Sequence, residues 1–182
     1  MEHESRPNQP ASVSAEWLLR IAERISEGTA LPEVLDFTFD SLHGIIPYDR
    51  IGLALLDEAG EGVSAAWSRS REGIGEIAKG YSLPLADTSL GVVLATRHPR
   101  ILNDLPLYLD LKPHSESTRL LVAEGIRSSL TCPLLARENT IGFLFFSSRE
   151  LGAYTSAHAA LFDRLALLVA LAVDKARMRD KL

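Results

Sequence analysis

The sequence predicts an α+β domain in which helices flank an antiparallel sheet. Three observations support this class: apolar residues recur at helical spacing near both ends of the chain, two hairpin-like pairs of strands lie between them, and strands and helices do not alternate regularly. A chain of 182 residues with 46% hydrophobic and 24% charged residues has the size and composition of one globular domain. Disordered and fibrous classes are therefore excluded.

Two helices are expected in the first quarter of the chain. Apolar residues recur at helical spacing from Trp17 to Ile25, and Gly28 ends this first helix. A second helix fits residues 31–43, where a proline lies in the first turn and an apolar face follows. Residues 1–12 are mostly polar and contain two prolines, so we expect them to form a disordered leader.

The middle of the chain is expected to form the sheet, together with small helices. In chain order the predicted elements are a hairpin of strands 50–57 and 63–68, a short strand 81–85, a short helix 89–97, a short strand 99–104, a helix 115–124, and a hairpin of strands 128–136 and 140–148. Both faces of strand 140–148 are apolar, which predicts that it is covered on both sides.

A long helix is predicted over residues 156–182. Its end becomes highly charged while the apolar spacing continues, a pattern typical of an emerging coiled-coil linker, although a solvated helix end fits equally well. We therefore expect the domain to span residues 13–176 and residues 177–182 to begin a helical linker to a possible downstream module.

Several function classes are excluded or disfavoured by composition and motifs. A net charge of −5 disfavours nucleic-acid binding. A lone cysteine, Cys132, excludes an internal disulfide and a cysteine-based zinc site, and the five histidines do not have metal-ligand spacing, so no metal site is expected. No signal peptide and no apolar run of about 18 residues is evident, which predicts a cytoplasmic protein without membrane contact. No catalytic residue is predicted, because the sequence shows no catalytic pairing of carboxylates and no GxSxG elbow.

Two segments in the second half of the chain carry recognisable motifs. Residues 121–134, LVAEGIRSSLTCPL, and residues 139–148, NTIGFLFFSS, resemble the GIRS-x-L-x-x-PL passage of GAF domains and the strand that follows it in that family. Upstream, residues 89–91 and 98–105 resemble the family's short helix and its P-x-x-I-x-D-L stretch. The resemblance extends over residues 14–176.

This resemblance implies a GAF/PAS-like fold with a six-stranded antiparallel sheet, flanking helices, terminal helices that pack together, and a small-molecule pocket on one face. It also implies a regulatory role, because such modules precede histidine kinases, cyclases and transcriptional activators. The family binds cyclic nucleotides, bilins, haem or small acids, so the ligand and any cofactor stay unknown at this point.

Candidate ligand contacts lie in the segments that would line or cover this pocket. They are Trp67, Tyr81, Asp104, Tyr108, His114 and Arg119. The aromatic side chains suit an apolar pocket with a few polar groups, and the basic ones suit an anionic ligand. Each has a structural alternative: an ordinary core aromatic, a turn cap for Asp104, a solvated loop residue for His114 and a surface residue for Arg119.

Cys132 is expected to be a small buried thiol. It lies in the middle of a predicted strand and no histidine follows it, so covalent attachment of a bilin, as in GAF-type photoreceptors, is disfavoured. The free-methionine-sulfoxide reductases that share this fold need several cysteines, so that chemistry is disfavoured as well. Ser147 and Ser148 occupy positions where cyclic-nucleotide GAF domains carry an Asn-Lys pair, which argues against that ligand.

The sequence therefore predicts a sensory domain that binds a small molecule and passes its occupancy through the last helix to an output partner. The terminal helices are expected to form a homodimer in the common two-fold arrangement. The residues assigned to these dimerising and signalling helices are Trp17, Ile21, Leu165, Leu168 and Ala172. The alternatives are a dimerisation module without a ligand and an enzyme of the sulfoxide-reductase type.

Overall fold

The computed structural model describes residues 9–73, 77 and 79–182. The first eight residues of the predicted leader lie outside this range. Helix α1 begins at Gln9, so the last four residues of that segment are helical.

The elements follow the predicted order. The helices are α1 (Gln9–Ser26), α2 (Leu31–Ser41), the 3-10 turn η1 (Leu85–Asp87), α3 (Gly91–Thr96), α4 (Leu105–Leu111), α5 (Glu116–Ala123) and α6 (Ser156–Asp180). The strands are β1 (Arg50–Leu56), β2 (Gly62–Ser70), β3 (Ser82–Pro84), β4 (Arg100–Leu102), β5 (Ser128–Ala136) and β6 (Asn139–Ser148). Helix α4 is the one α-helix that was not predicted from the sequence.

The six strands form one antiparallel sheet in the order β3-β2-β1-β6-β5-β4. The two long hairpins, β1–β2 and β5–β6, lie in the middle and pair with each other through β1 and β6. The short strands β3 and β4 form the two edges. This confirms the predicted α+β class and the six-stranded sheet.

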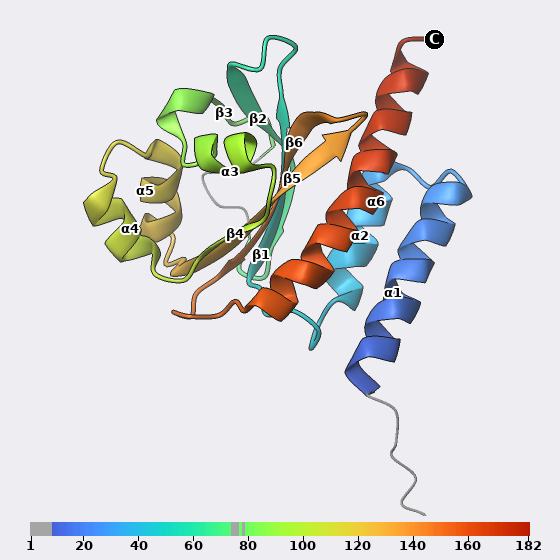
Figure 1. Ribbon diagram of the computed structural model, residues 1–182, viewed down its shortest axis with the longest axis horizontal. Coiled ribbons are helices and arrows are strands. Elements are labelled where there is room, and N and C mark those ends of the chain that lie inside the picture. The colour runs from blue at the N-terminus through green and yellow to red at the C-terminus, as the bar shows by residue number, and fades with distance from the viewer. Residues whose placement is uncertain (1–8, 74–76, 78) are drawn as a thin grey trace, which may run out of the picture.

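Helices α1, α2 and α6 lie on one face of the sheet, and α3, α4 and α5 lie on the other (Figure 1). The main core lies between the sheet and the first group of helices, where Phe162 of α6 stacks on Phe146 of β6 with 4.1 Å between the ring centroids. Lys175 of α6 donates a hydrogen bond of 3.0 Å to the carbonyl of Ile25 at the end of α1. The predicted contact between the terminal helices is therefore confirmed.

Helix α6 is long and apolar enough, by length and composition, to cross a membrane. Seven of its residues are nevertheless buried inside this fold, and they belong to the main core. Since the core helix of a globular domain has the same composition, we interpret α6 as the cover of the sheet.

Candidate functional site

A cavity of about 80 Å³ lies between the second face of the sheet and the elements that cover it. Its wall combines strands β1, β2, β4, β5 and β6 with helix α5 and the segments around residues 77–90. Apolar side chains make up much of the lining, among them Val63, Leu90, Leu102, Leu121 and Phe145. A volume of this size holds roughly five to eight water-sized groups, which suits a small organic molecule.

The strand register explains which side chains reach the floor of this cavity. Side chains alternate between the two faces of a strand, so only every second residue points to the cavity. Two cross-strand rows form the floor, the first of Arg50, Ser147, Ser129 and Leu102, and the second of Gly52, Phe145, Thr131 and Arg100. The residues between them, such as Ile51 and Leu130, belong to the main core on the opposite face.

Arg50 brings a buried positive charge to one end of the floor. Its side chain is only 6% exposed, and its Nη2 donates a hydrogen bond of 2.7 Å to the carbonyl of Ile77. The guanidinium lies beside Gly52, where a Cβ would stand 3.5 Å from it, in ordinary van der Waals contact. Burial lowers the pKa of Arg50, and the carboxylate of Glu124 acts in the opposite direction.

Arg100 brings a second positive charge from the far edge of the floor. Its two terminal nitrogens donate to the carbonyl and, at 2.8 Å, to the hydroxyl of Ser89, which ties strand β4 to the segment before α3. Its guanidinium carbon lies 5.8 Å from the ring centre of Tyr108. Burial lowers the pKa of Arg100, and Tyr108 opposes this effect.

Two polar atoms of the cavity wall have no hydrogen-bond partner within the described part of the chain. They are the Nε of Arg100 and the Oγ of Ser147, both buried. In the same part of the chain, neither Arg50 nor Arg100 forms a salt bridge with a carboxylate. Buried polar groups are normally satisfied, so these atoms indicate a place for a polar ligand group or for ordered water.

Comparison with known proteins assigns the family. Residues 28–174 match the family model described as the GAF domain. The chain belongs to the GAF family. No curated protein sequence gives a significant match to it.

Solved GAF structures share the fold of this GAF domain. The GAF domain of a phosphoenolpyruvate-protein phosphotransferase from Coxiella burnetii has a TM-score of 0.75 at 19% identity, with 93% of this chain and 97% of that one covered. The free methionine-R-sulfoxide reductase of Neisseria meningitidis, solved with its substrate, has a TM-score of 0.71 at 18% identity, with 98% of each chain covered. A phycocyanobilin-bound GAF domain from a cyanobacterial phytochrome has a TM-score of 0.73 at 15% identity, with 91% and 96% covered. At these identities the similarity shows the fold alone.

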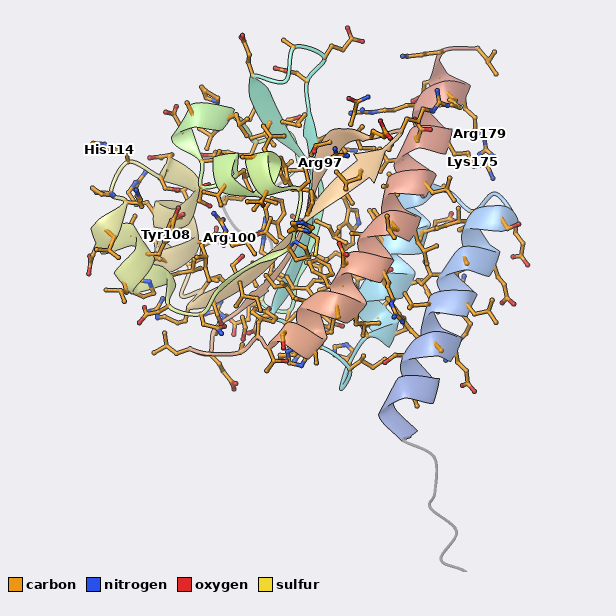
Figure 2. The ribbon with its side chains drawn as sticks, viewed as in Figure 1. Arg97, Arg100, Tyr108, His114, Lys175 and Arg179 are labelled. Atoms are coloured by element: carbon orange, nitrogen blue, oxygen red, sulfur yellow. The ribbon has the colours of Figure 1, made fainter. Side chains whose placement is uncertain are left out.

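The aromatic candidates lie at or beside the cavity. Trp67 and Tyr81 border it. Trp67 pairs with Leu53 across the β1–β2 hairpin, and its side chain packs against the main core. Tyr108 lies next to Arg100 and contacts its guanidinium rather than the cavity wall (Figure 2).

The three other ligand candidates lie outside the wall of the cavity. His114 is exposed at the outer edge of the layer that contains α4 and α5 (Figure 2). Arg119 is exposed and pairs with Glu116 one turn earlier on α5. Asp104 caps α4, since its carboxylate accepts a hydrogen bond of 3.0 Å from the backbone N–H of Leu107.

The polar residues of the floor were missed by the sequence reasoning. Arg50 begins a strand that is otherwise apolar, and this charge in a buried strand is the signal that could have marked it. Arg100, Ser147 and Thr131 give no such signal, because only the pairing of β4 with β5 and of β5 with β6 brings them together.

Cys132 is fully buried on the face of β5 opposite to the cavity, among Leu130 and Leu134 of the main core. Burial raises the pKa of its thiol, which keeps it protonated. The sulfur therefore does not face a ligand in the cavity. No group of three or more potential metal-ligating residues is found among the residues the structure describes.

The residues assigned to the dimerising helices are mostly core residues of the single chain. Trp17, Ile21, Leu165 and Ala172 are at most 8% exposed, and Leu168 is half-buried. The indole N–H of Trp17, for example, donates a hydrogen bond of 2.7 Å to the hydroxyl of Ser41 on α2. The large exposed apolar side chains of α1 and α6 belong to other residues than these five.

Proposed function

We propose that this GAF domain is a regulatory module that binds a small molecule in the cavity between the sheet, helix α5 and the segments around residues 77–90. The observation that supports it best is a mostly apolar cavity with unsatisfied buried polar atoms in its wall. A volume of about 80 Å³ favours a ligand well below the size of a nucleotide, a bilin or haem.

A direct connection joins the cavity to the start of α6. Asn103 follows strand β4, which carries Arg100, and its side-chain amide contacts Tyr154 twice. Its Nδ2 donates to the carbonyl of Tyr154 at 2.8 Å, and its Oδ1 accepts from the N–H of Tyr154 at 3.1 Å. Thr155, the next residue, caps α6. We propose that a ligand that shifts β4 thereby shifts the first turn of α6, and that α6 carries the change to an output partner.

The proposed role is binding rather than catalysis, in the cytoplasm and without nucleic-acid or membrane contact. The single thiol is buried away from the cavity, which argues against the chemistry of the reductase that shares this fold. The apolar length of α6 is used for packing on the sheet, which argues against membrane insertion.

A cavity-filling substitution tests ligand binding. Ala65 of β2 lines the cavity and pairs with Ala54. In a thermal-shift screen of small acids, amides, alcohols and nucleotides, we expect at least one small compound to stabilise the wild-type protein. At 100 times its dissociation constant it adds about 2.7 kcal/mol, or about 5–11 °C in Tm. Ala65→Leu should abolish this shift, because the larger side chain occupies the space.

The control is Ala15→Leu, which makes the same chemical change at an exposed position of α1 and should leave the shift intact. A stabilising compound whose effect survives Ala65→Leu binds elsewhere, and this result would contradict the proposal. A screen with no small-molecule hit would favour the alternative of a ligand-free dimerisation module.

We also propose that the chain forms a homodimer through α6. Leu167, Leu171 and Met178 are 58%, 58% and 43% exposed. Their spacing of four and seven residues places them on one stripe of the helix, and Leu19 of α1 is 59% exposed as well. An exposed apolar stripe along a long helix is typical of a helical dimer interface.

A charge in this stripe should separate the two copies. We expect Leu171→Glu to convert a dimer to a monomer in size-exclusion chromatography with light scattering, because the carboxylate would be buried at the interface. Leu151→Glu is the matched control, since Leu151 is 61% exposed and lies in a loop outside the helices. A wild-type protein that is monomeric at high micromolar concentration would refute the dimer.

A further inference from the structure

The positive charges at the two ends of the cavity floor and the two unpartnered polar atoms of its wall indicate the class of ligand. Arg50 and Arg100 lie on β1 and β4, which are three strand spacings, or about 14 Å, apart. Ser147 and Ser129 lie in the row of Arg50, and Thr131 lies in the row of Arg100. The floor thus offers hydrogen-bond donors and positive charge. No described carboxylate lies within salt-bridge distance of either arginine, and Glu124 acts on Arg50 from farther away.

The fixed position of Arg100 is the central feature of this arrangement. Its Nη1 and Nη2 are both held by Ser89, so the guanidinium is anchored before any ligand binds. The N–H at Nε is left buried without a partner among the described residues. A buried guanidinium donor that is already positioned favours an anionic acceptor, because charge-assisted hydrogen bonds are the stronger ones.

Ser147 supplies the second donor. Its side chain is only 1% exposed, and its hydroxyl has no partner among the described residues. Two strand spacings and two residues separate Ser147 from Arg100, which puts their Cα atoms about 12 Å apart with the cavity between the side chains. Two donors from two strands suit the two oxygens of one carboxylate group.

The apolar part of the cavity wall limits the chemistry and the size of the rest of the ligand, beyond its carboxylate. Val63, Leu90, Leu121 and Phe145 line the cavity, so the rest of the ligand should be apolar. The volume of about 80 Å³ limits it to a short chain or a small ring.

We propose that the ligand of this GAF domain is a small carboxylic acid with a short apolar body, held at its carboxylate by Arg100 Nε and Ser147 Oγ. This inference rests on the proposed function and adds the ligand's charge and size to it. An inorganic oxyanion lacks the apolar body, and a neutral amide of the same shape lacks the charge.

Isovalerate and isovaleramide are suitable probes, because they have nearly the same shape and differ in charge. Isothermal titration with the full chain should show isovalerate binding at least about tenfold more tightly than isovaleramide, and inorganic phosphate binding more weakly than isovalerate. Arg100→Met and Ser147→Ala should each weaken isovalerate binding by about tenfold or more, while binding of isovaleramide changes much less.

Matched controls separate ligand binding from folding. Arg20→Met removes an exposed arginine of α1, and Ser148→Ala removes the adjacent serine, whose hydroxyl already contacts Asp49. Both should leave isovalerate binding unchanged. Ser147→Ala removes an unsatisfied hydroxyl, so the free variant should unfold at the same temperature as the wild type or higher, which keeps the test valid if Arg100→Met folds poorly.

Equal affinities for isovalerate and isovaleramide would overturn the carboxylate assignment and leave a ligand-binding cavity in place. Tighter binding of phosphate, or no binding of isovalerate at all, would overturn the assignment as well. The broader proposal is decided separately, by whether any compound of the thermal-shift screen depends on Ala65.

Discussion

Replacement of Phe162 by alanine is expected to lower the free energy of unfolding by about 3–5 kcal/mol, the range for a buried phenylalanine. Phe162 is fully buried and joins α6 to the sheet through its stack on Phe146. The substitution leaves a cavity in the middle of the main core, which the surrounding strands cannot close. Urea unfolding followed by circular dichroism measures the loss.

Phe37→Ala is the matched control. Phe37 of α2 is half-buried, and the guanidinium of Arg24 covers its ring at 3.8 Å, so the same change should cost clearly less. Equal losses for the two variants, or a loss below about 1 kcal/mol for Phe162→Ala, would contradict the packing of α6 on the sheet.

Replacement of Asn103 by alanine is expected to cost about 2–4 kcal/mol, because it removes two hydrogen bonds and leaves both backbone groups of Tyr154 without these partners. The same urea titration measures the loss. Hydrogen exchange should in addition show faster opening of the first turn of α6 than of its middle, since Asn103 fixes the residue that precedes the cap.

Asn139→Ala is the control for this second substitution. Asn139 is the exposed first residue of β6, and among the described residues its side-chain amide contacts only the carbonyl of Arg137, at 3.3 Å, so its loss should cost no more than about 0.5 kcal/mol. If Asn103→Ala were equally mild, the segment before α6 would not depend on β4, and the proposed route from the cavity to α6 would fail.

The fold could be predicted because its signals are local. The two long hairpins are marked by strands of suitable length with polar or glycine-containing turns, and α6 by an apolar stripe that continues for several turns. Helix α4 was missed because it is only seven residues long, and its cap, Asp104, fits an isolated turn equally well in the sequence.

The candidate site could be predicted only in part, because its wall is defined by strand pairing. Tyr81 was predicted as a ligand contact because its segment was expected to line the pocket, and it does border the cavity. Arg100 and Ser147 are 47 residues apart in sequence and meet the same cavity only through the register of β4, β5 and β6. His114 and Arg119 lie in the covering layer, as the sequence predicts, but they are on its exposed side. Residue type and segment do not determine which side of a short helix faces inward.

The ligand-dependent change in hydrogen exchange along α6 shows whether occupancy of the cavity reaches this helix. The wild-type protein is measured with and without the small compound that gives the largest thermal shift, and Asn103→Ala is measured in parallel. We predict slower exchange in the cavity strands of both proteins, and in the first turns of α6 in the wild type alone. Slower exchange confined to the cavity strands of the wild type would show that the cavity binds a ligand without signalling through α6, which would contradict the proposed transmission from the cavity to an output partner.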